Sequence, residues 1–328
     1  MNRRIMLILR TGISAALMAA LIYMTRESVP KMIEALAELP FYIFPTGLAL
    51  FFVSIVIASF RLRILLSAQG IKLNIAKIAK LTLLGYFFSS FLPTSVGGDV
   101  VKALYISSES KKPISSYTAV FMDRFLGMST IFLMATVALL LSARAFSLRG
   151  KWLLPALLGA SVLTLAFFFD KRMARKLSRL LGPMIPGRLK KKLQNIYEAM
   201  HNFKGHKSAI AGSALISIAG QITAFSSVYV FGLGLGSHIP FKVVLLAMPI
   251  ASIVSMVPSL YGTGPREAAV LMILSPFMGR EKALAIALLW LGVLLATAFA
   301  GGIIYGVMGL KKRPVVKIPE KGIDDLIR

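Results

Sequence analysis

The sequence predicts an all-α polytopic membrane protein, built from an inverted repeat of span, re-entrant hairpin and span. The first observation is composition: the 328 residues are 57% hydrophobic and 16% charged, which is less charge than a soluble domain of this size carries. The second is that uncharged runs of the length needed to cross a bilayer core of about 30 Å recur along the chain. These runs are 41–60, 81–98, 125–143, 152–169, 208–237, 243–265 and 283–310.

The third observation is the distribution of basic residues, which gather in the gaps between the apolar runs, as the positive-inside rule expects of cytoplasmic loops. Eleven Lys and Arg lie between Lys171 and Lys207, so we expect the loop 170–207 to contact the anionic surface of the cytoplasmic leaflet. No aromatic residues are interleaved with them as in a base-stacking surface, so the net charge of +25 does not indicate nucleic-acid binding. The chain has no cysteine, and we expect no metal and no cofactor.

The charge rule gives a threading of the chain with both termini in the cytoplasm. A span at 5–24 leads out and is followed by a short external amphipathic helix within 25–40; the span 41–60 then returns and leaves Arg61 in a cytoplasmic loop. Spans at 114–141, 152–169, 208–234 and 283–310 follow. This gives about six full spans, and the sequence leaves two further apolar segments between them.

These two segments are expected to be re-entrant hairpins because the apolar stretch after each is too short to cross a bilayer. Only 103–108 is uncharged after Lys102, so the segment 81–108 would open to the cytoplasm and turn at 93–99. Only 268–279 is uncharged after Glu267, so the second hairpin, which begins at Val243, would open outward.

The two hairpin segments are related by a constant offset of 165 residues. Leu92-Pro93-Thr94 matches Val257-Pro258-Ser259, Gly97 matches Gly262, and Ala103 matches Ala268. We therefore expect a single transmembrane domain over 1–310, with repeat one at about 41–141 and repeat two at about 208–310. A cytoplasmic tail over 311–328 follows.

Paired broken segments in an inverted repeat are typical of a transporter's central site, where non-helical backbone lines a cavity and half-helix ends present partial charges. Glycine lets such backbone turn and approach a ligand closely. The expected substrate-binding residues are the tip residues and the charges near them: Pro93, Thr94, Ser95, Gly97, Gly98, Asp99, Lys102, Asp123, Arg124, Pro258, Ser259, Gly262, Gly264, Arg266 and Glu267.

Ionisable residues within spans usually face partners or water because burying them in lipid is costly. We expect Arg124, Arg266 and Lys102 to receive a phosphate headgroup, since a guanidinium donates two hydrogen bonds at once. Asp99, Asp123 and Glu267 would balance these cations or carry a coupling proton. The alternative is that the charges form internal ion pairs that lock the two halves together. Neighbours on a helix do not face each other, so we expect pairing between the hairpins and no pair between Asp123 and Arg124.

These residues resemble the flippase-like transmembrane family named after the membrane region of lysylphosphatidylglycerol synthase. The resemblance covers about 5–310 and is carried by the motifs Leu92-Pro93, Gly97-Gly98-Asp99, Asp123-Arg124, Gly127, Pro258-Ser259, Gly262, Gly264, Arg266 and Glu267. It implies lipid translocation, in the family above all of aminoacylated phosphatidylglycerol. Only 18 residues follow Leu310, so we expect no soluble aminoacyl-transfer domain, and the lipid cargo stays open.

The sequence thus predicts a flippase or lipid transporter in the cytoplasmic membrane of a prokaryote. Its expected partner is a membrane lipid with an anionic or phosphate-containing headgroup, and homo-oligomerisation is left open. One alternative is a membrane-embedded transferase acting on a lipid-linked substrate, with Asp99 or Glu267 as general base. The other is a scaffold of an envelope-lipid pathway.

Overall fold

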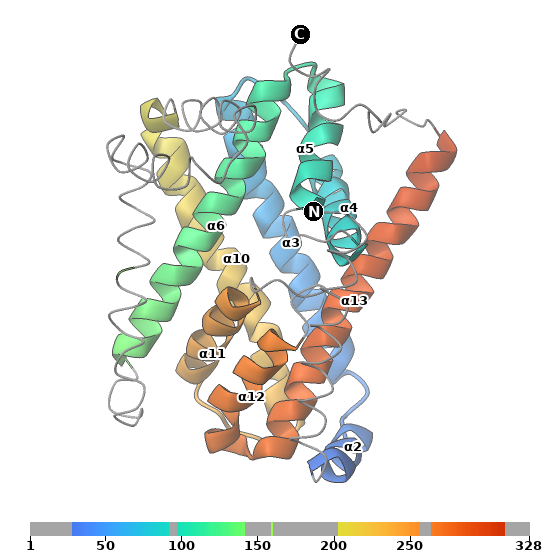
Figure 1. Cartoon of the computed structure of the whole chain (residues 1–328), viewed down its shortest axis with the longest axis vertical. Coiled ribbons are helices and arrows are strands. Elements are labelled where there is room, and N and C mark those ends of the chain that lie inside the picture. Colours follow the sequence, from blue (N-terminus) through green and yellow to red (C-terminus); the bar gives the residue numbers. More distant parts are fainter. Residues whose placement is uncertain (1–27, 92–96, 142–158, 160–202, 256–263, 312–328) are drawn as a thin grey trace, which may run out of the picture.

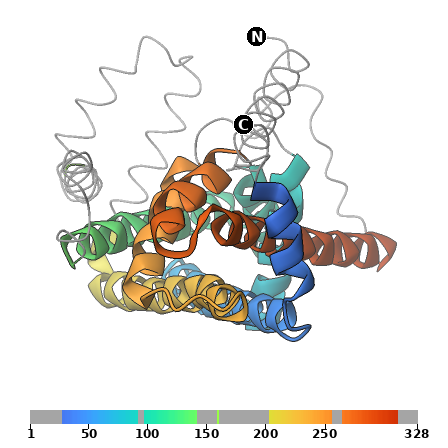
Figure 2. The same cartoon turned by 90° about the horizontal axis from the view of Figure 1, so that it is seen from below.

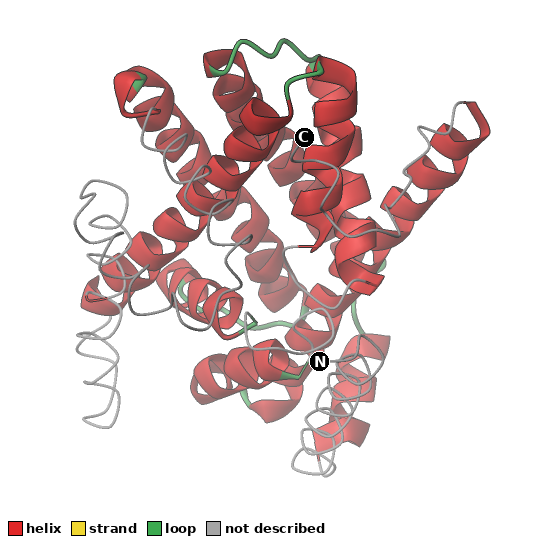
Figure 3. Ribbon diagram, turned by 45° about the horizontal axis from the view of Figure 1, so that its top comes forward, coloured by secondary structure: helices red, strands yellow, loops and turns green. Residues whose placement is uncertain are grey.

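The described part of the chain is helical throughout. A computed structural model describes residues 28–91, 97–141, 159, 203–255 and 264–311. Within these ranges it contains helices and connecting loops and no strand (Figure 3). The all-α prediction is therefore confirmed for these residues. The expected span 5–24, nearly all of 152–169 and of the basic loop 170–207, and the tail beyond 311 lie outside the described residues.

Four long helices form the frame of the molecule: α3 (Ile43–Ala68), α6 (Pro113–Leu141), α10 (Lys207–Gly234) and α13 (Arg280–Lys311). Among the described residues, these four are long and apolar enough to cross a membrane. They also carry large apolar side chains that no neighbour covers, such as Leu215 on α10 and Phe299 on α13. Helices that are apolar all round belong in a large core or in lipid, so the chain is a polytopic membrane protein.

Four shorter helices form two hairpins between the long ones. In the first, α4 (Ile75–Phe91) packs against α5 (Gly97–Ser110); in the second, α11 (Phe241–Val254) packs against α12 (Pro265–Met278). Figure 1 shows the helices of the first hairpin in the upper half of the molecule and those of the second in the lower half. The residues at the two bends, 92–96 and 256–263, lie outside the described residues.

The two halves of the chain interlock. The helix α3 packs along α10, while α4 of the first half packs against α13 and α11 of the second half packs against α6. Figure 1 also shows that counterparts run in opposite directions: α3 rises where α10 descends, and α6 descends where α13 rises. Each hairpin therefore packs on its own half and on the closing long helix of the other half.

Glycine permits the closest of these helix contacts. A Cβ atom added at Gly98 of α5 would overlap the carbonyl oxygen of Gly85 of α4. Similarly, a Cβ at Gly301 of α13 would overlap the carbonyl oxygen of Leu83 of α4. The backbone of α4 thus touches both of its neighbours at positions where a side chain has no room, as is typical of helix packing in membranes.

Each hairpin has its own apolar core. One cluster of buried side chains surrounds the first hairpin and includes Leu65 of α3, Ile78 of α4 and Ile106 of α5. A second, larger cluster surrounds the other hairpin and includes Val244 of α11 and Val270 of α12. The helix α3 contributes to both clusters, its last turns to the first and its first turns to the second.

The structure corrects two predicted boundaries. The prediction that the second span ends at residue 60 is wrong, because α3 continues to Ala68; Leu62, Leu65 and Leu66 bury the extra turns. The prediction of a turn through 93–99 is also wrong at its end, because α5 begins at Gly97. The Cβ-free surface of Gly98 lets that first turn pack directly on α4.

A short helix, α2 (Val29–Ala37), confirms the helix expected within 25–40. It packs against α13 and lies across it when the molecule is seen from below (Figure 2). Phe41 and Tyr42, which join α2 to α3, are among the exposed large apolar residues. Aromatic residues at such a position suit a membrane–water interface.

Candidate functional site

A network of ion pairs connects the first hairpin to the long helices. On α5, Asp99 accepts from Lys102 Nζ at 3.1 Å through Oδ1 and from Arg124 Nη1 of α6 at 2.5 Å through Oδ2. The Lys102 ammonium also lies 3.6 Å from Asp123 Oδ2 of α6. Four residues that the sequence singled out therefore meet at one place.

The network extends to a third and a fourth helix through Arg61 of α3. The Arg61 Nε donates to Asp123 Oδ1 at 2.6 Å, and its Nη1 donates to Ser217 Oγ of α10 at 2.7 Å. A Cβ at Gly127 of α6 would stand 3.2 Å from Arg61 Nη1, so this glycine leaves room for the guanidinium. Ser217 also shares a 2.8 Å hydrogen bond with Thr130 of α6. Arg61 thereby joins both halves of the chain.

The centre of the network is buried, whereas the side chains of Asp99 and Arg124 are 24% and 26% exposed, and the network carries a positive excess. Lys102 and Asp123 are 5% and 6% exposed. Among the described residues that form it, three cations, Arg61, Lys102 and Arg124, face two carboxylates. A buried excess of positive charge is costly unless an anion compensates for it.

The network lies well inside the molecule. Asp123 follows Pro113, the first residue of α6, by about 15 Å along the helix axis. Asp99 precedes Ser110, the last residue of α5, by about 16 Å. Because α5 and α6 are joined at 111–112, both carboxylates lie at a similar depth from that end. That depth is about half the thickness of a hydrocarbon core.

A second charged group lies at the start of α12, in the second hairpin. Glu267 Oε2 accepts a hydrogen bond from the backbone N–H of Gly264 at 2.6 Å, which satisfies a donor at the helix N-terminus. Glu267 Oε1 accepts from Arg266 Nη2 at 2.8 Å and from its Nε at 3.2 Å. Both side chains are buried, at 7% for Arg266 and 1% for Glu267. Gly264 has φ +92°, a conformation that favours glycine.

The pairing predictions have mixed outcomes. Asp123 and Arg124 take different partners, as expected for neighbours on a helix. In the second hairpin, Arg266 and Glu267 pair with each other, and pairing between the two hairpins stays a prediction. Adjacent residues can meet there because Glu267 turns back to cap the first turn of α12, which brings its carboxylate beside the Arg266 guanidinium.

The predicted site residues fall into three sets. Asp99, Lys102, Asp123 and Arg124 form the charge network, with Gly97 and Gly98 in the first turn of α5 beside it. Gly264, Arg266 and Glu267 form the second group. The remaining six lie outside the described residues: Pro93, Thr94, Ser95, Pro258, Ser259 and Gly262.

The sequence prediction missed Arg61 and Ser217. Arg61 was assigned to a cytoplasmic loop because the positive-inside rule treats an arginine at the end of an apolar run as a flank. The signal that argues otherwise is the apolar segment Ile64-Leu65-Leu66, which resumes just beyond it. Ser217 has no comparable signal, since hydroxyl residues recur throughout 208–237. In the described ranges, no group of three or more His, Asp or Glu side chains is placed to hold a metal ion.

Comparison with known proteins places the chain in a family. No curated protein and no solved structure matches it. A family model described as the lysylphosphatidylglycerol synthase TM region matches residues 7–302, which includes α3, α6, α10, both hairpins and α13 as far as residue 302. This protein therefore belongs to the family of the lysylphosphatidylglycerol synthase transmembrane region, as the resemblance of its hairpin motifs predicted.

Proposed function

We propose that the protein is a lipid flippase or lipid transporter, which moves a lipid with an anionic or phosphate-containing headgroup between leaflets. The headgroup would bind at the Arg61–Lys102–Arg124 network while the acyl chains stay in the bilayer. The single observation that carries this proposal is the partly buried network with three cations and two carboxylates. Membership of a membrane family named for a lipid synthase supports a lipid substrate.

The dimensions of the short helices support two re-entrant hairpins. The helix α4 has 17 residues and each of α5, α11 and α12 has 14, which gives axial lengths of about 25 and 21 Å. A hydrocarbon core of about 30 Å needs about 20 helical residues. On this proposal each pair enters and leaves on one side, the first hairpin from the cytoplasm and the second from outside.

The orientation of the half-helices supports an anion site between them. Both α5 and α12 begin on the side nearer the middle of the molecule and run toward its outer ends (Figure 1). Their N-termini, the positive ends of the helix dipoles, therefore point inward. Discontinuous helices that direct their N-termini at a central anionic group are typical of transporters with inverted repeats.

The ion pairs suggest how a phosphate would be received. In the structure, Asp99 compensates Arg124 and Lys102. A lipid phosphate could take over the same donors, since a guanidinium binds phosphate through two parallel hydrogen bonds. Release of Asp99 would loosen the hold of α6 on the first hairpin, and the hairpin could then move relative to the long helices. The bound headgroup would be exposed alternately to the two sides.

The test is reconstitution of the purified full chain into vesicles with fluorescent lipids, in which a membrane-impermeant reductant reports the leaflet of each label. We expect the wild-type protein to accelerate exchange of an anionic phospholipid. Arg124→Gln should slow the exchange about tenfold or more, because a hydrogen bond to a charged group contributes about 1.5–3 kcal/mol. Lys242→Gln is the matched control, since it removes one exposed cation at the start of α11.

Folding must be separated from transport in this experiment. Arg124→Lys keeps the charge and should retain part of the rate, and each variant should elute as a single species in size-exclusion chromatography. If wild-type vesicles exchange no lipid class faster than empty vesicles, the proposal fails. It also fails if folded Arg124→Gln and the wild type exchange all lipids at the same rate.

A further inference from the structure

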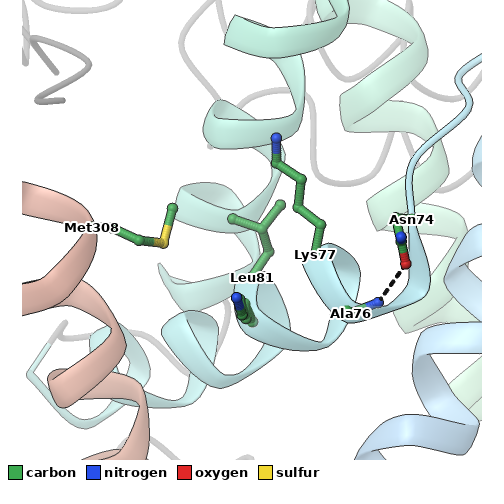
Figure 4. Close-up of a pocket in the computed structure, with 6 residues that line it drawn as sticks. Asn74, Ala76, Lys77, Leu81 and Met308 are labelled. Carbon is green, nitrogen blue, oxygen red and sulfur yellow. Dashed lines mark hydrogen bonds between the residues drawn. The ribbon is translucent and has the colours of Figure 1, made fainter. Parts of the chain in front are cut away.

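A cavity of about 350 Å³ opens between the start of α4 and the end of α13, and its lining shares no residue with the charge network. Figure 4 shows it with Met308 reaching from α13 toward Leu81 of α4. It therefore spans the contact between the first hairpin and the last long helix, which belong to different halves of the chain. Its lining residues are Asn74, Ala76, Lys77, Lys80, Leu81 and Met308.

The lining combines an apolar floor with a cationic rim. Leu81 is 2% exposed, and Met308 packs on the same apolar cluster. Lys77 forms an ion pair with Glu109 of α5. Lys80 makes no ion pair with any residue in the described ranges, so one positive charge at the rim is uncompensated there. The side-chain oxygen of Asn74 accepts a hydrogen bond from the Ala76 N–H at 3.0 Å and so caps α4 (Figure 4).

The surface around the cavity is basic as well. Lys112 Nζ donates to the Gly70 carbonyl oxygen at 3.2 Å, so the turn between α5 and α6 lies against the loop that leads into α4. This contact gathers Lys72, Lys111 and Lys112 at the same end of the molecule as the cavity. A basic pocket between membrane helices suits the headgroup of an anionic lipid, which the surrounding leaflet supplies.

We infer that this cavity binds a resident anionic phospholipid. Lys77 and Lys80 hold the phosphate at the rim, and the upper part of one acyl chain lies on Leu81 and Met308. The lipid would join α4 to α13 and so bridge the two halves. This inference depends only on the protein being in a membrane and does not rest on lipid transport.

The absence of cysteine from the sequence permits a local test. A bimane label on Ala76→Cys reports lipids at the cavity, and one on Leu215→Cys reports the apolar surface of α10, where Leu215 is 69% exposed. The labelled full chain is reconstituted into vesicles of phosphatidylcholine containing increasing fractions of doxyl-labelled phosphatidylglycerol or doxyl-labelled phosphatidylcholine. The mole fraction that gives half-maximal quenching measures the local preference.

At Ala76 we expect doxyl-labelled phosphatidylglycerol to reach half-maximal quenching at a mole fraction at least about five times lower than doxyl-labelled phosphatidylcholine. The reason is that each nearby lysine raises the affinity for an anionic lipid about five-fold. Leu215 should show no preference. Lys77→Gln/Lys80→Gln should abolish the preference at Ala76, while Arg63→Gln/Lys207→Gln, which removes two exposed charges from the same end, should keep it.

Three results would overturn the inference: equal quenching by both lipids at Ala76, a preference that survives the double substitution, or equal loss in the Arg63 and Lys207 control. The last result would mean that only the general surface charge attracts the lipid. Transport gives an independent readout, because Lys77→Gln/Lys80→Gln should still exchange lipid between leaflets. A failed quenching test thus leaves the proposed function standing, and failed transport leaves the cavity site standing.

Discussion

The two hairpins have the same design and use their charges differently. In the first, Asp99 and Lys102 of α5 reach Arg124 and Asp123 of α6, and Arg61 extends the network to α3 and α10. In the second, one carboxylate oxygen of Glu267 accepts from the Gly264 N–H and the other pairs with Arg266. Both partners lie on α12 or directly before it. Charge ties the first hairpin to three long helices, and in the second hairpin Glu267 stabilises the first turn of α12.

We propose that the two hairpins have different roles. The first hairpin holds the positive excess, so it is the better place for an anionic headgroup. The second has a balanced pair and a larger apolar cluster around it. The offset of 165 residues aligns Lys102 with Glu267 and Asp99 with Gly264, so related positions carry different charges. Substitutions in each hairpin test this difference.

The largest loss of stability is expected from Asp123→Asn. This change removes the carboxylate that compensates both Arg61 and Lys102, and breaking a buried pair costs about 3–5 kcal/mol. The free energy of unfolding in mixed micelles, measured by titration with SDS, gives the value. Arg61→Gln combined with Asp123→Asn should recover part of the loss. A double variant that is merely additive would argue against the pair.

A smaller loss, about 3 kcal/mol, is expected from Gly98→Ala, because the added methyl overlaps a backbone oxygen of Gly85 that has no rotamer to change. In the second hairpin, Gly264→Ala should cost about 1–3 kcal/mol through backbone strain at φ +92°. The same titration compares them. Gly212→Ala, at a helical position with no atom within 4 Å of the added Cβ, is the control and should be neutral or slightly stabilising. Equal effects at Gly98 and Gly212 would refute the close contact of α4 and α5.

For Glu267→Gln we expect a loss of about 1.5–3 kcal/mol, since the amide oxygen can still cap Gly264 while the charge that binds Arg266 is lost. The effect should stay within the second hairpin. Hydrogen exchange followed by mass spectrometry checks this, with faster exchange in α12 and unchanged exchange in α5. Equal deprotection of both helices would contradict the division between the hairpins.

The smallest effect is expected for Lys77→Gln. Its pair with Glu109 joins α4 and α5 at the surface, where the two side chains are 44% and 39% exposed. Exposed pairs contribute about 0.2–1 kcal/mol, so the unfolding midpoint should hardly move. A loss of stability comparable to that of Asp123→Asn would show that burial does not determine how strongly an ion pair stabilises the first hairpin.

Much of the helix order could be predicted from the sequence because charge counting is a long-range constraint on a membrane chain. The shortness of the apolar stretches after Lys102 and Glu267 predicted short helices there, as found in α5 and α12, and three of the four described long helices, α6, α10 and α13, lie close to the expected ranges. The role of Arg61 was not predicted, because the sequence does not distinguish an arginine that is paired inside the protein from one that flanks a span. Its partners, Asp123 and Ser217, lie 62 and 156 residues away in sequence.

The ion pair between the adjacent residues Arg266 and Glu267 was not predicted, for a local reason. The rule that adjacent helical residues do not face each other holds in the interior of α6, where Asp123 and Arg124 take different partners. It does not hold at the first turn of α12, where an unsatisfied N–H draws the Glu267 side chain back along the helix. The sequence alone does not place residue 267 in a first turn, so the Arg266–Glu267 pair could not be predicted.

We propose that the two hairpins enter the bilayer from opposite sides, and the accessibility of introduced cysteines distinguishes this arrangement from entry on one side. Lys111 and Arg280 are exposed residues beside the outer ends of the first and second hairpins, and the chain has no native cysteine. With a membrane-impermeant maleimide, Arg280→Cys should react in intact cells, whereas Lys111→Cys should react only after permeabilisation. Reaction of both positions from the same side would contradict the account.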